Sequence, residues 1–156
     1  MRHITRKRTS MNQIHKPLLL IADDDDDDRV LIEQALKQTA FNGQIRFVED
    51  GEQLIQYLKD CQSDSPDAPQ RPTLLLVDLN MPVVNGIEAL TYIKSVPGLR
   101  QLPVVMLTTS SAETDISTCY NLGASSFVIK PITFTKLVEL MDSLRTYWLG
   151  TVQLPR

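Results

Sequence analysis

Four short apolar stretches of this chain each end in side chains that can do chemistry. The stretches are rich in Leu, Val and Ile, as buried parallel strands are. The polar side chains at their ends are carboxylates, a hydroxyl and an ammonium: Asp23 with Asp24, then Asp78, Thr108 and Lys130. In an open parallel sheet, ligands bind beyond the carboxyl ends of the strands. We therefore expect these side chains to meet at one edge of a sheet and to form a site.

The chemistry of this set points to phosphoryl transfer. Three carboxylates in a small cleft raise one another's pKa unless a cation lies between them. Oxygen ligands suit a hard ion such as Mg²⁺, which retains waters and can accept the oxygens of a phosphoryl group. Lys130 would supply a positive charge and Thr108 a hydroxyl donor. Because phosphoryl transfer needs positioning and charge neutralisation, and carboxylates form acyl phosphates, the set predicts Asp78 as the phosphoacceptor.

Six consecutive aspartates, residues 23–28, leave the register of the acidic pair open by one residue. Counting back from the helical pattern of residues 31–36 places the pair at Asp23 and Asp24, and a shift would place it one residue later, ending at Asp25. We prefer the first register because it leaves the preceding strand uninterrupted. The rest of the run is expected in the loop and first helical turn, where negative charge is favourable. Extra metal affinity from it is the less favoured alternative.

Strands and helices are predicted to alternate after Pro17. Apolar patterns predict strands at 18–22, 44–48, 74–78, 103–107 and 126–129. They predict helices at about 28–39, after Gly51, from Gly86 to Ile93, from Ser110 to Gly123, and from about Thr133 to Leu149. Strands that alternate with single helices indicate a parallel sheet with helices on both faces, a three-layer α/β sandwich.

Local signals bound the fourth of these helices. Ser110 and Glu113 fit the Ser-x-x-Glu capping box, which predicts that the helix begins there. Gly123 suits the position just past a helix end. Earlier in the chain, residues 61–72 contain three prolines and are expected to form a surface loop.

Length and composition limit the class of protein. The 156 residues, with 42% apolar residues, fit one globular domain, predicted at 17–149 with a tail at 150–156. Residues 1–16 are basic and poor in apolar side chains, which predicts a disordered leader rather than a nucleic-acid arm. No membrane span or signal peptide is expected. Cys61 and Cys119 lack metal-type spacing and are expected to be reduced thiols of a cytoplasmic protein.

Four motifs, in this order, resemble the receiver domain of two-component response regulators: LLLIADD, LLLVDLNMPVVNG, PVVMLTT and GASSFVIKP. The resemblance covers about residues 17–147. It implies a flavodoxin-like fold with a five-stranded sheet of order 2-1-3-4-5. It also implies a cis peptide between Lys130 and Pro131.

The resemblance assigns a role to the acidic residues. Asp78 would accept the phosphoryl group. Asp23 and Asp24 would hold Mg²⁺ together with Asp78 and the backbone carbonyl of Asn80. Lys130 would be the essential lysine of the family.

The resemblance also implies a switch and a partner. Thr108 would be the switch hydroxyl, and Phe127 the aromatic residue that rotates inward when Thr108 swings toward the phosphate. A sensor histidine kinase would phosphorylate a stand-alone regulator, which catalyses only its own phosphorylation and dephosphorylation and is otherwise not an enzyme. A phosphorylation-independent scaffold or adaptor that keeps the same fold is the alternative.

The C-terminal region suggests which partners the chain meets. Its closing sequence WLGTVQLP resembles a subset of regulators that pair with phytochrome-type or other sensor kinases. The last helix has one apolar stripe: Phe134, Leu137, Met141, Leu144 and Trp148. Further apolar residues lie beyond that stripe: Val138, Leu140, Tyr147 and Leu149. Such a surplus suggests a homodimer or partner face, and scattered apolar surface is the alternative.

Other classes of site fit less well. An EF-hand needs Gly at the sixth and Glu at the twelfth loop position, and no loop starting within residues 23–28 has them. A phosphatase with an aspartyl nucleophile would carry a second Asp two residues later, where this chain has Asn80. The glycines of dinucleotide and P-loop sites are absent from the sequence.

Overall fold

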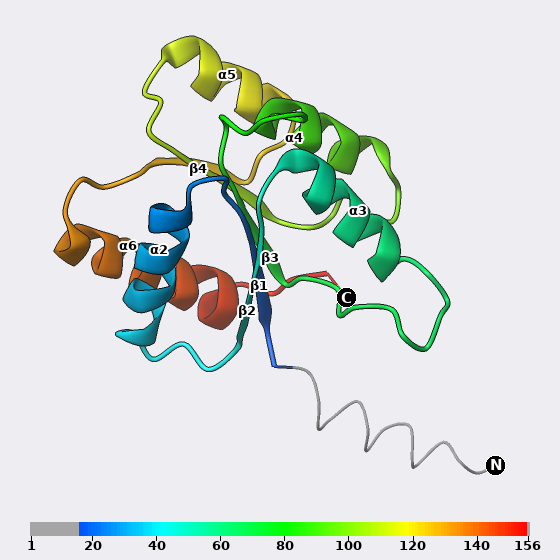
Figure 1. Cartoon of the computed structure of the whole chain (residues 1–156), viewed down its shortest axis with the longest axis horizontal. Helices are drawn as coiled ribbons and strands as arrows, with labels where there is room; N and C mark the ends of the chain where they lie inside the picture. Colours follow the sequence, from blue (N-terminus) through cyan, green and yellow to red (C-terminus); the bar gives the residue numbers. More distant parts are fainter. Residues whose placement is uncertain (1–15, 156) are drawn as a thin grey trace.

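The computed structural model describes residues 16–155. In this part of the chain, five parallel strands form one sheet in the order β2-β1-β3-β4-β5 (Figure 1). The strands are β1 (Leu18–Ala22), β2 (Gln44–Val48), β3 (Leu74–Val77), β4 (Val104–Thr108) and β5 (Ser126–Ile129). The predicted strand order is confirmed. The predicted leader, residues 1–16, lies outside the described residues except for Lys16, so it stays a prediction, as do the domain boundaries.

Helices cover both faces of the sheet, as predicted (Figure 1). On one face lie α2 (Asp26–Lys37) and α6 (Phe134–Thr146). On the other face lie α3 (Gly51–Cys61), α4 (Gly86–Ser95) and α5 (Glu113–Asn121). A short π-helix, η1 (Tyr147–Thr151), continues α6.

The central strands are buried on both faces. Along β1, Leu18 and Leu20 belong to the core beneath α3, α4 and α5, while Leu19 and Ile21 belong to the core beneath α2 and α6. Strands β3 and β4 alternate in the same way, and every residue of the three strands is buried. A strand covered on both faces needs apolar side chains at every position, which explains the uninterrupted apolar runs of the sequence.

The sheet register brings the strand ends to one level. Asp23 and Asp78 directly follow paired residues of β1 and β3. The backbone N–H of Asp78 donates to the carbonyl of Ala22 at 2.9 Å. Likewise, the backbone N–H of Lys130 donates to the carbonyl of Thr108 at 2.7 Å. The side chains that follow four different strands therefore start from the same edge.

The predicted capping box at Ser110 and Glu113 is wrong. Helix α5 begins only at Glu113, and the residue before it makes no side-chain cap. The Ser110 hydroxyl instead donates to Asp115 Oδ2 at 2.7 Å. A capping box does occur at the start of α4, where Asn85 and Glu88 each accept from the other's backbone N–H.

Two further expectations about the end of the chain need correction. The peptide between Lys130 and Pro131 is trans, since no cis peptide occurs among residues 16–155. The trans form is the favoured one for most X–Pro bonds. The predicted helix over residues 133–149 is α-helical only to Thr146 and then widens into η1.

The surplus apolar residues of the last helix mostly contact the core. Val138, Leu140 and Leu149 are half-buried against the core beneath α2 and α6. Tyr147 is 52% exposed. The surplus therefore widens the packing of α6 and η1 more than it forms a free face. No helix among the described residues is both long enough and apolar enough to span a membrane.

Candidate functional site

Three carboxylates gather at the carboxyl edge of the sheet. Asp23, Asp24 and Asp78 each offer an oxygen, and these oxygens all lie within 4.8 Å of one another. Asp23 is 2% exposed and Asp78 8% exposed, whereas Asp24 faces solvent. Hard oxygen donors with one open side suit a divalent ion such as Mg²⁺ that keeps some of its waters. The residues present therefore fit the predicted metal.

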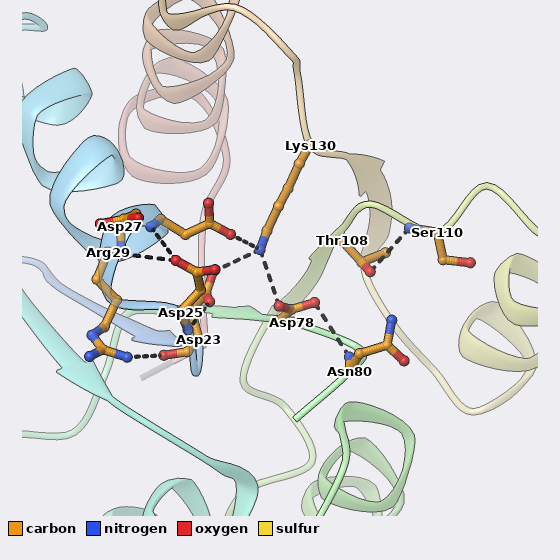
Figure 2. Close-up of polar contacts among 10 residues, drawn as sticks. Asp23, Asp25, Asp27, Arg29, Asp78, Asn80, Thr108, Ser110 and Lys130 are labelled. Carbon is orange, nitrogen blue, oxygen red and sulfur yellow. Dashed lines mark hydrogen bonds and ion pairs between the residues drawn. The ribbon is translucent and has the colours of Figure 1, made fainter. Parts of the chain in front are cut away.

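Lys130 reaches into this group from the end of β5 (Figure 2). Its ammonium donates to Asp23 Oδ2 at 2.8 Å, to Asp78 Oδ2 at 3.1 Å and to Asp28 Oδ2 at 2.7 Å. Burial alone would lower the pKa of Lys130, but the hydrogen bonds to Asp23 and Asp28 outweigh it and hold that pKa above its usual value. Lys130 is therefore a fixed positive charge among the carboxylates.

Burial has the larger effect on Asp23. It raises the pKa of this carboxyl above its usual value, although the bonds from Lys130 and from the backbone N–H of Asp25 oppose the change. That N–H donates to Asp23 Oδ1 at 2.9 Å. The ionised form of Asp23 thus costs free energy that a bound divalent ion would offset.

The later aspartates of the run have separate contacts. Asp25 is the N-cap of α2, and its Oδ1 accepts from the backbone N–H of Asp27 at 2.8 Å and of Asp28 at 3.0 Å (Figure 2). Asp26 pairs with Arg29. Asp25 therefore caps the helix and does not belong to the cluster of Asp23, Asp24 and Asp78.

Two contacts were not foreseen from the sequence. Asp28 is not one of the three clustered carboxylates, yet it accepts the shortest of the hydrogen bonds from the Lys130 ammonium. Arg29 Nη1 donates to the carbonyl of Asp23 at 2.6 Å and so ties the end of β1 to α2. Both residues lie in the first part of α2. The helix begins at Asp26, two residues earlier than predicted.

The turn after β3 fixes Asp78 by close backbone packing. A Cβ on Gly86 would lie 2.3 Å from the Asp78 carbonyl oxygen, so only glycine allows α4 to start against β3. The backbone N–H of Asn80 donates to Asp78 Oδ1 at 3.4 Å (Figure 2). The predicted role of the Asn80 carbonyl as a metal ligand remains a proposal.

Thr108 and Phe127 lie on the neighbouring strands. Thr108 is fully buried at the end of β4, and its hydroxyl accepts from the backbone N–H of Ser110 at 3.3 Å (Figure 2). Phe127 is half-buried against the core beneath α3, α4 and α5. Its backbone N–H donates to the Tyr120 hydroxyl at 3.1 Å, which links β5 to α5. The structure thus places both residues on the elements that adjoin the site.

Comparisons with known proteins point to one family. The family model for the response regulator receiver domain matches residues 19–142. Response regulator Rcp1 from Synechocystis sp. is 34% identical over 140 residues, which cover 90% of this chain and 93% of Rcp1.

Solved structures of two relatives have the same fold. The phosphorylated cyanobacterial phytochrome response regulator RcpA matches with a TM-score of 0.82 and 34% identity, over 92% of this chain and 100% of RcpA. The Mn²⁺-bound form of Rcp1 matches with a TM-score of 0.80 and 32% identity, over 90% of this chain and 99% of that one. Receiver domains bind Mg²⁺ or Mn²⁺ at an acidic pocket, and they are signalling proteins rather than enzymes in the usual sense. This chain belongs to the response regulator receiver family.

Proposed function

We propose that this protein accepts a phosphoryl group on Asp78 from a sensor histidine kinase and that phosphorylation switches a partner-binding surface. The observation that carries the proposal is the sharing of one ammonium, that of Lys130, by Asp78 and Asp23 within a group of three carboxylates. Asp23, Asp24, Asp78 and the backbone carbonyl of Asn80 would hold Mg²⁺. When bound, the ion supplies positive charge to the oxygens of the transferring group.

The transfer itself asks little covalent chemistry of the protein. A carboxylate oxygen of Asp78 attacks the phosphorus of a phosphohistidine, so that an O–P bond forms as the N–P bond breaks. The electron pair of the broken bond stays on the imidazole nitrogen, which takes up a proton. Lys130, whose ammonium lies 3.1 Å from Asp78 Oδ2, would neutralise the negative charge that the phosphoryl oxygens bring to the site.

The switch would start from the added charge of the phosphoryl group, about −1.5 to −2. Thr108 would turn its hydroxyl from the backbone N–H of Ser110 toward a phosphoryl oxygen. Phe127 would then move further into the space beside β4 and change the surface formed by α5, β5 and α6. Tyr120 and Ile129 expose large side chains on this surface, at 49% and 47%.

The approach to Asp78 suggests where the kinase docks. A hollow beside the site is lined by both polar and apolar groups, among them Asp28, Lys130, Leu31 and Ile132. Leu31 and Ile132 are large, exposed side chains that line this hollow. A phosphodonor that docks over this hollow would contact both, and their apolar surface suits a helix of the kinase. Because the relatives include phytochrome response regulators, we propose a phytochrome-type kinase as the partner.

Acetyl phosphate tests the central claim without a kinase. The chain is incubated with acetyl phosphate and Mg²⁺, and its intact mass is measured. We expect a phosphoryl adduct on the native chain, none without Mg²⁺, and none on Asp78→Asn. Asp64→Asn is a matched control because it removes one exposed acid in the loop after α3.

Two outcomes would contradict the proposal. The absence of an adduct on the folded native chain would favour the scaffold alternative. An undiminished adduct on Asp78→Asn would place the phosphoryl group on another residue.

A further inference from the structure

Lys130 has three hydrogen-bond donors, and three carboxylates use them. Two of these carboxylates, Asp23 and Asp78, belong to the group that fits a divalent ion. The third, Asp28, does not belong to that group, yet its bond of 2.7 Å is the shortest of the three. The ammonium is therefore shared between the metal group and one residue of α2.

Asp28 is held in place by the start of its helix. It lies in the first turn of α2, and its backbone N–H donates to the N-cap residue Asp25 at 3.0 Å. Its carboxylate is partly exposed, whereas the Lys130 side chain is 11% exposed. Asp28 thus offers the ammonium a position at the outer rim of the site, on the side of α2.

The contact between Asp28 and Lys130 affects how strongly the ammonium competes with a divalent ion for oxygen atoms. The oxygens that Lys130 contacts on Asp23 and Asp78 are Oδ2 atoms of the same carboxylates that a divalent ion would need. An ammonium and a divalent ion repel each other and compete for such oxygens. A further carboxylate that draws the ammonium outward reduces that competition.

We propose that Asp28 is a positioning residue that draws Lys130 toward α2 and thereby strengthens divalent-ion binding by Asp23, Asp24 and Asp78. The inference rests on the proposed function, because it assigns the acidic group to Mg²⁺. Asp28 acts through Lys130 and touches neither the ion nor the phosphoryl group.

The same helical turn contains a matched control. Asp27 is exposed, carries the same charge, and makes no side-chain hydrogen bond or ion pair among the described residues. Asp27→Asn therefore removes one charge from the same helical turn but leaves Lys130 with all three partners. The difference between Asp28→Asn and Asp27→Asn isolates the contact with Lys130.

Titration calorimetry with MgCl₂ tests the proposal directly. We expect Asp28→Asn to weaken the affinity for Mg²⁺ by roughly two- to fivefold, the upper part of the range for an ion pair with an exposed partner. Asp27→Asn should weaken it by less than about twofold because solvent and salt screen an exposed charge. Asp28→Glu keeps the carboxylate and should restore part of the loss. Circular dichroism checks that each variant is folded.

A double-mutant cycle separates positioning from simple charge. In a Lys130→Met background there is no ammonium to position, so Asp28→Asn should weaken Mg²⁺ binding no more than Asp27→Asn does. Equal effects of the two substitutions in the native background would overturn the proposal. So would an Asp28→Asn effect that persists undiminished in the Lys130→Met background.

Phosphorylation by acetyl phosphate distinguishes this inference from the proposed function. Asp28→Asn should need more Mg²⁺ for half-maximal phosphorylation but reach the same plateau. A native chain that forms no adduct at any Mg²⁺ concentration contradicts the proposed function itself. A native chain that is phosphorylated while Asp28→Asn and Asp27→Asn need equal Mg²⁺ contradicts only the role of Asp28.

Discussion

The interior of the sheet and its carboxyl edge come from the same strands but differ in their physics. From Leu18 to Ala22, β1 is apolar and at most 3% exposed. The next residue, Asp23, is equally buried but carries a carboxylate. Strand β3 changes in the same way between Val77 and Asp78. One step along the chain thus separates residues that stabilise the fold from residues that serve the site.

The comparison shows where stability and function are stored. Burial of apolar side chains in the interior stabilises the fold by about 25 cal/mol for each Å² removed from water. At the edge, burial raises the pKa of Asp23, so its ionised form lowers stability at neutral pH. Lys130 offsets part of this cost. The carboxylates at the edge thus lower the stability that the interior side chains supply. We infer that their role is chemical rather than structural.

The largest effect is expected from the interior. Leu75 lies at the centre of β3 and is fully buried, so Leu75→Ala removes buried methyl groups and leaves a cavity. We expect the free energy of unfolding in urea to fall by about 2–5 kcal/mol. Val30→Ala, at a position 52% exposed on α2, is the control and should change stability by less than about 0.5 kcal/mol. Similar losses from both substitutions would contradict the assignment of stability to the interior.

Divalent ions bound at the edge should stabilise the folded protein, by less than the buried Leu75 side chain does. A ligand that binds only the folded state at ten times its Kd adds about 1.4 kcal/mol to the free energy of unfolding. For a chain of this length, we expect MgCl₂ to raise Tm by about 3–5 °C and a chelator to reverse the change. Asp78→Asn should lose most of this response. A Tm of the native chain that does not depend on Mg²⁺ would argue against metal binding at the edge.

Much of the contrast between the apolar strands and the polar residues at their ends could be predicted from the sequence. Uninterrupted apolar runs ending in polar residues predicted the strands, and parallel strands bring their ends together, so Asp23, Asp78 and Lys130 were expected to meet. The contact between Asp28 and Lys130 could not be predicted. These residues are 102 positions apart, and Asp28 lies in the first turn of α2, which begins two residues earlier than predicted. Helix boundaries are the part of a sequence prediction that local patterns fix least well.

Capping patterns show the same limit. Ser110 and Glu113 fit the capping box but do not form it, because Ser110 bonds to Asp115 instead. Asn85 and Glu88 fit the same pattern and do form it. The pattern gives the residue types that can cap a helix, whereas tertiary packing decides where the helix starts. For α4 that packing includes Gly86, which lets the helix approach the backbone of Asp78.

Removal of a carboxylate from the edge should raise stability while it weakens ion binding. The folded-state pKa of Asp23 is above its unfolded value, so ionisation favours the unfolded chain. With a chelator present, we expect Asp23→Asn to increase the free energy of unfolding by about 1 kcal/mol at pH 7, within the usual range for relieved functional sites.

The pH dependence gives this prediction its sign. As pH falls through the raised pKa, the native carboxyl becomes neutral in the fold, so the advantage of Asp23→Asn should shrink and vanish at acid pH. Urea unfolding curves at several pH values measure the difference. An advantage that grows toward acid pH would mean that the ionised form of Asp23 stabilises the fold. Lys130→Met should lower the free energy of unfolding because it leaves Asp23 and Asp78 without their cationic partner.

The smallest effect is expected from backbone strain in the loop beside the site. Val83 has a φ of +66°, and the N–H of Val84 donates to the carbonyl of Pro82 at 2.8 Å, which makes a γ-turn centred on a β-branched residue. Such a conformation is unfavourable for valine, and Asn tolerates it better. Because Val83 is 72% exposed, Val83→Asn loses little burial, and we expect a gain of about 0.5–1 kcal/mol in urea unfolding.

Val83→Ile is the control for this last change, because it keeps the branched Cβ and should bring no gain. If Val83→Asn also leaves the Mg²⁺ affinity and the phosphorylation of Asp78 unchanged, the strain is separable from the chemistry of the edge. A loss of phosphorylation together with the gain in stability would instead show that the strained turn positions Asp78 and Asn80. A loss of stability in Val83→Asn would mean that the exposed valine makes contacts worth more than the strain it carries.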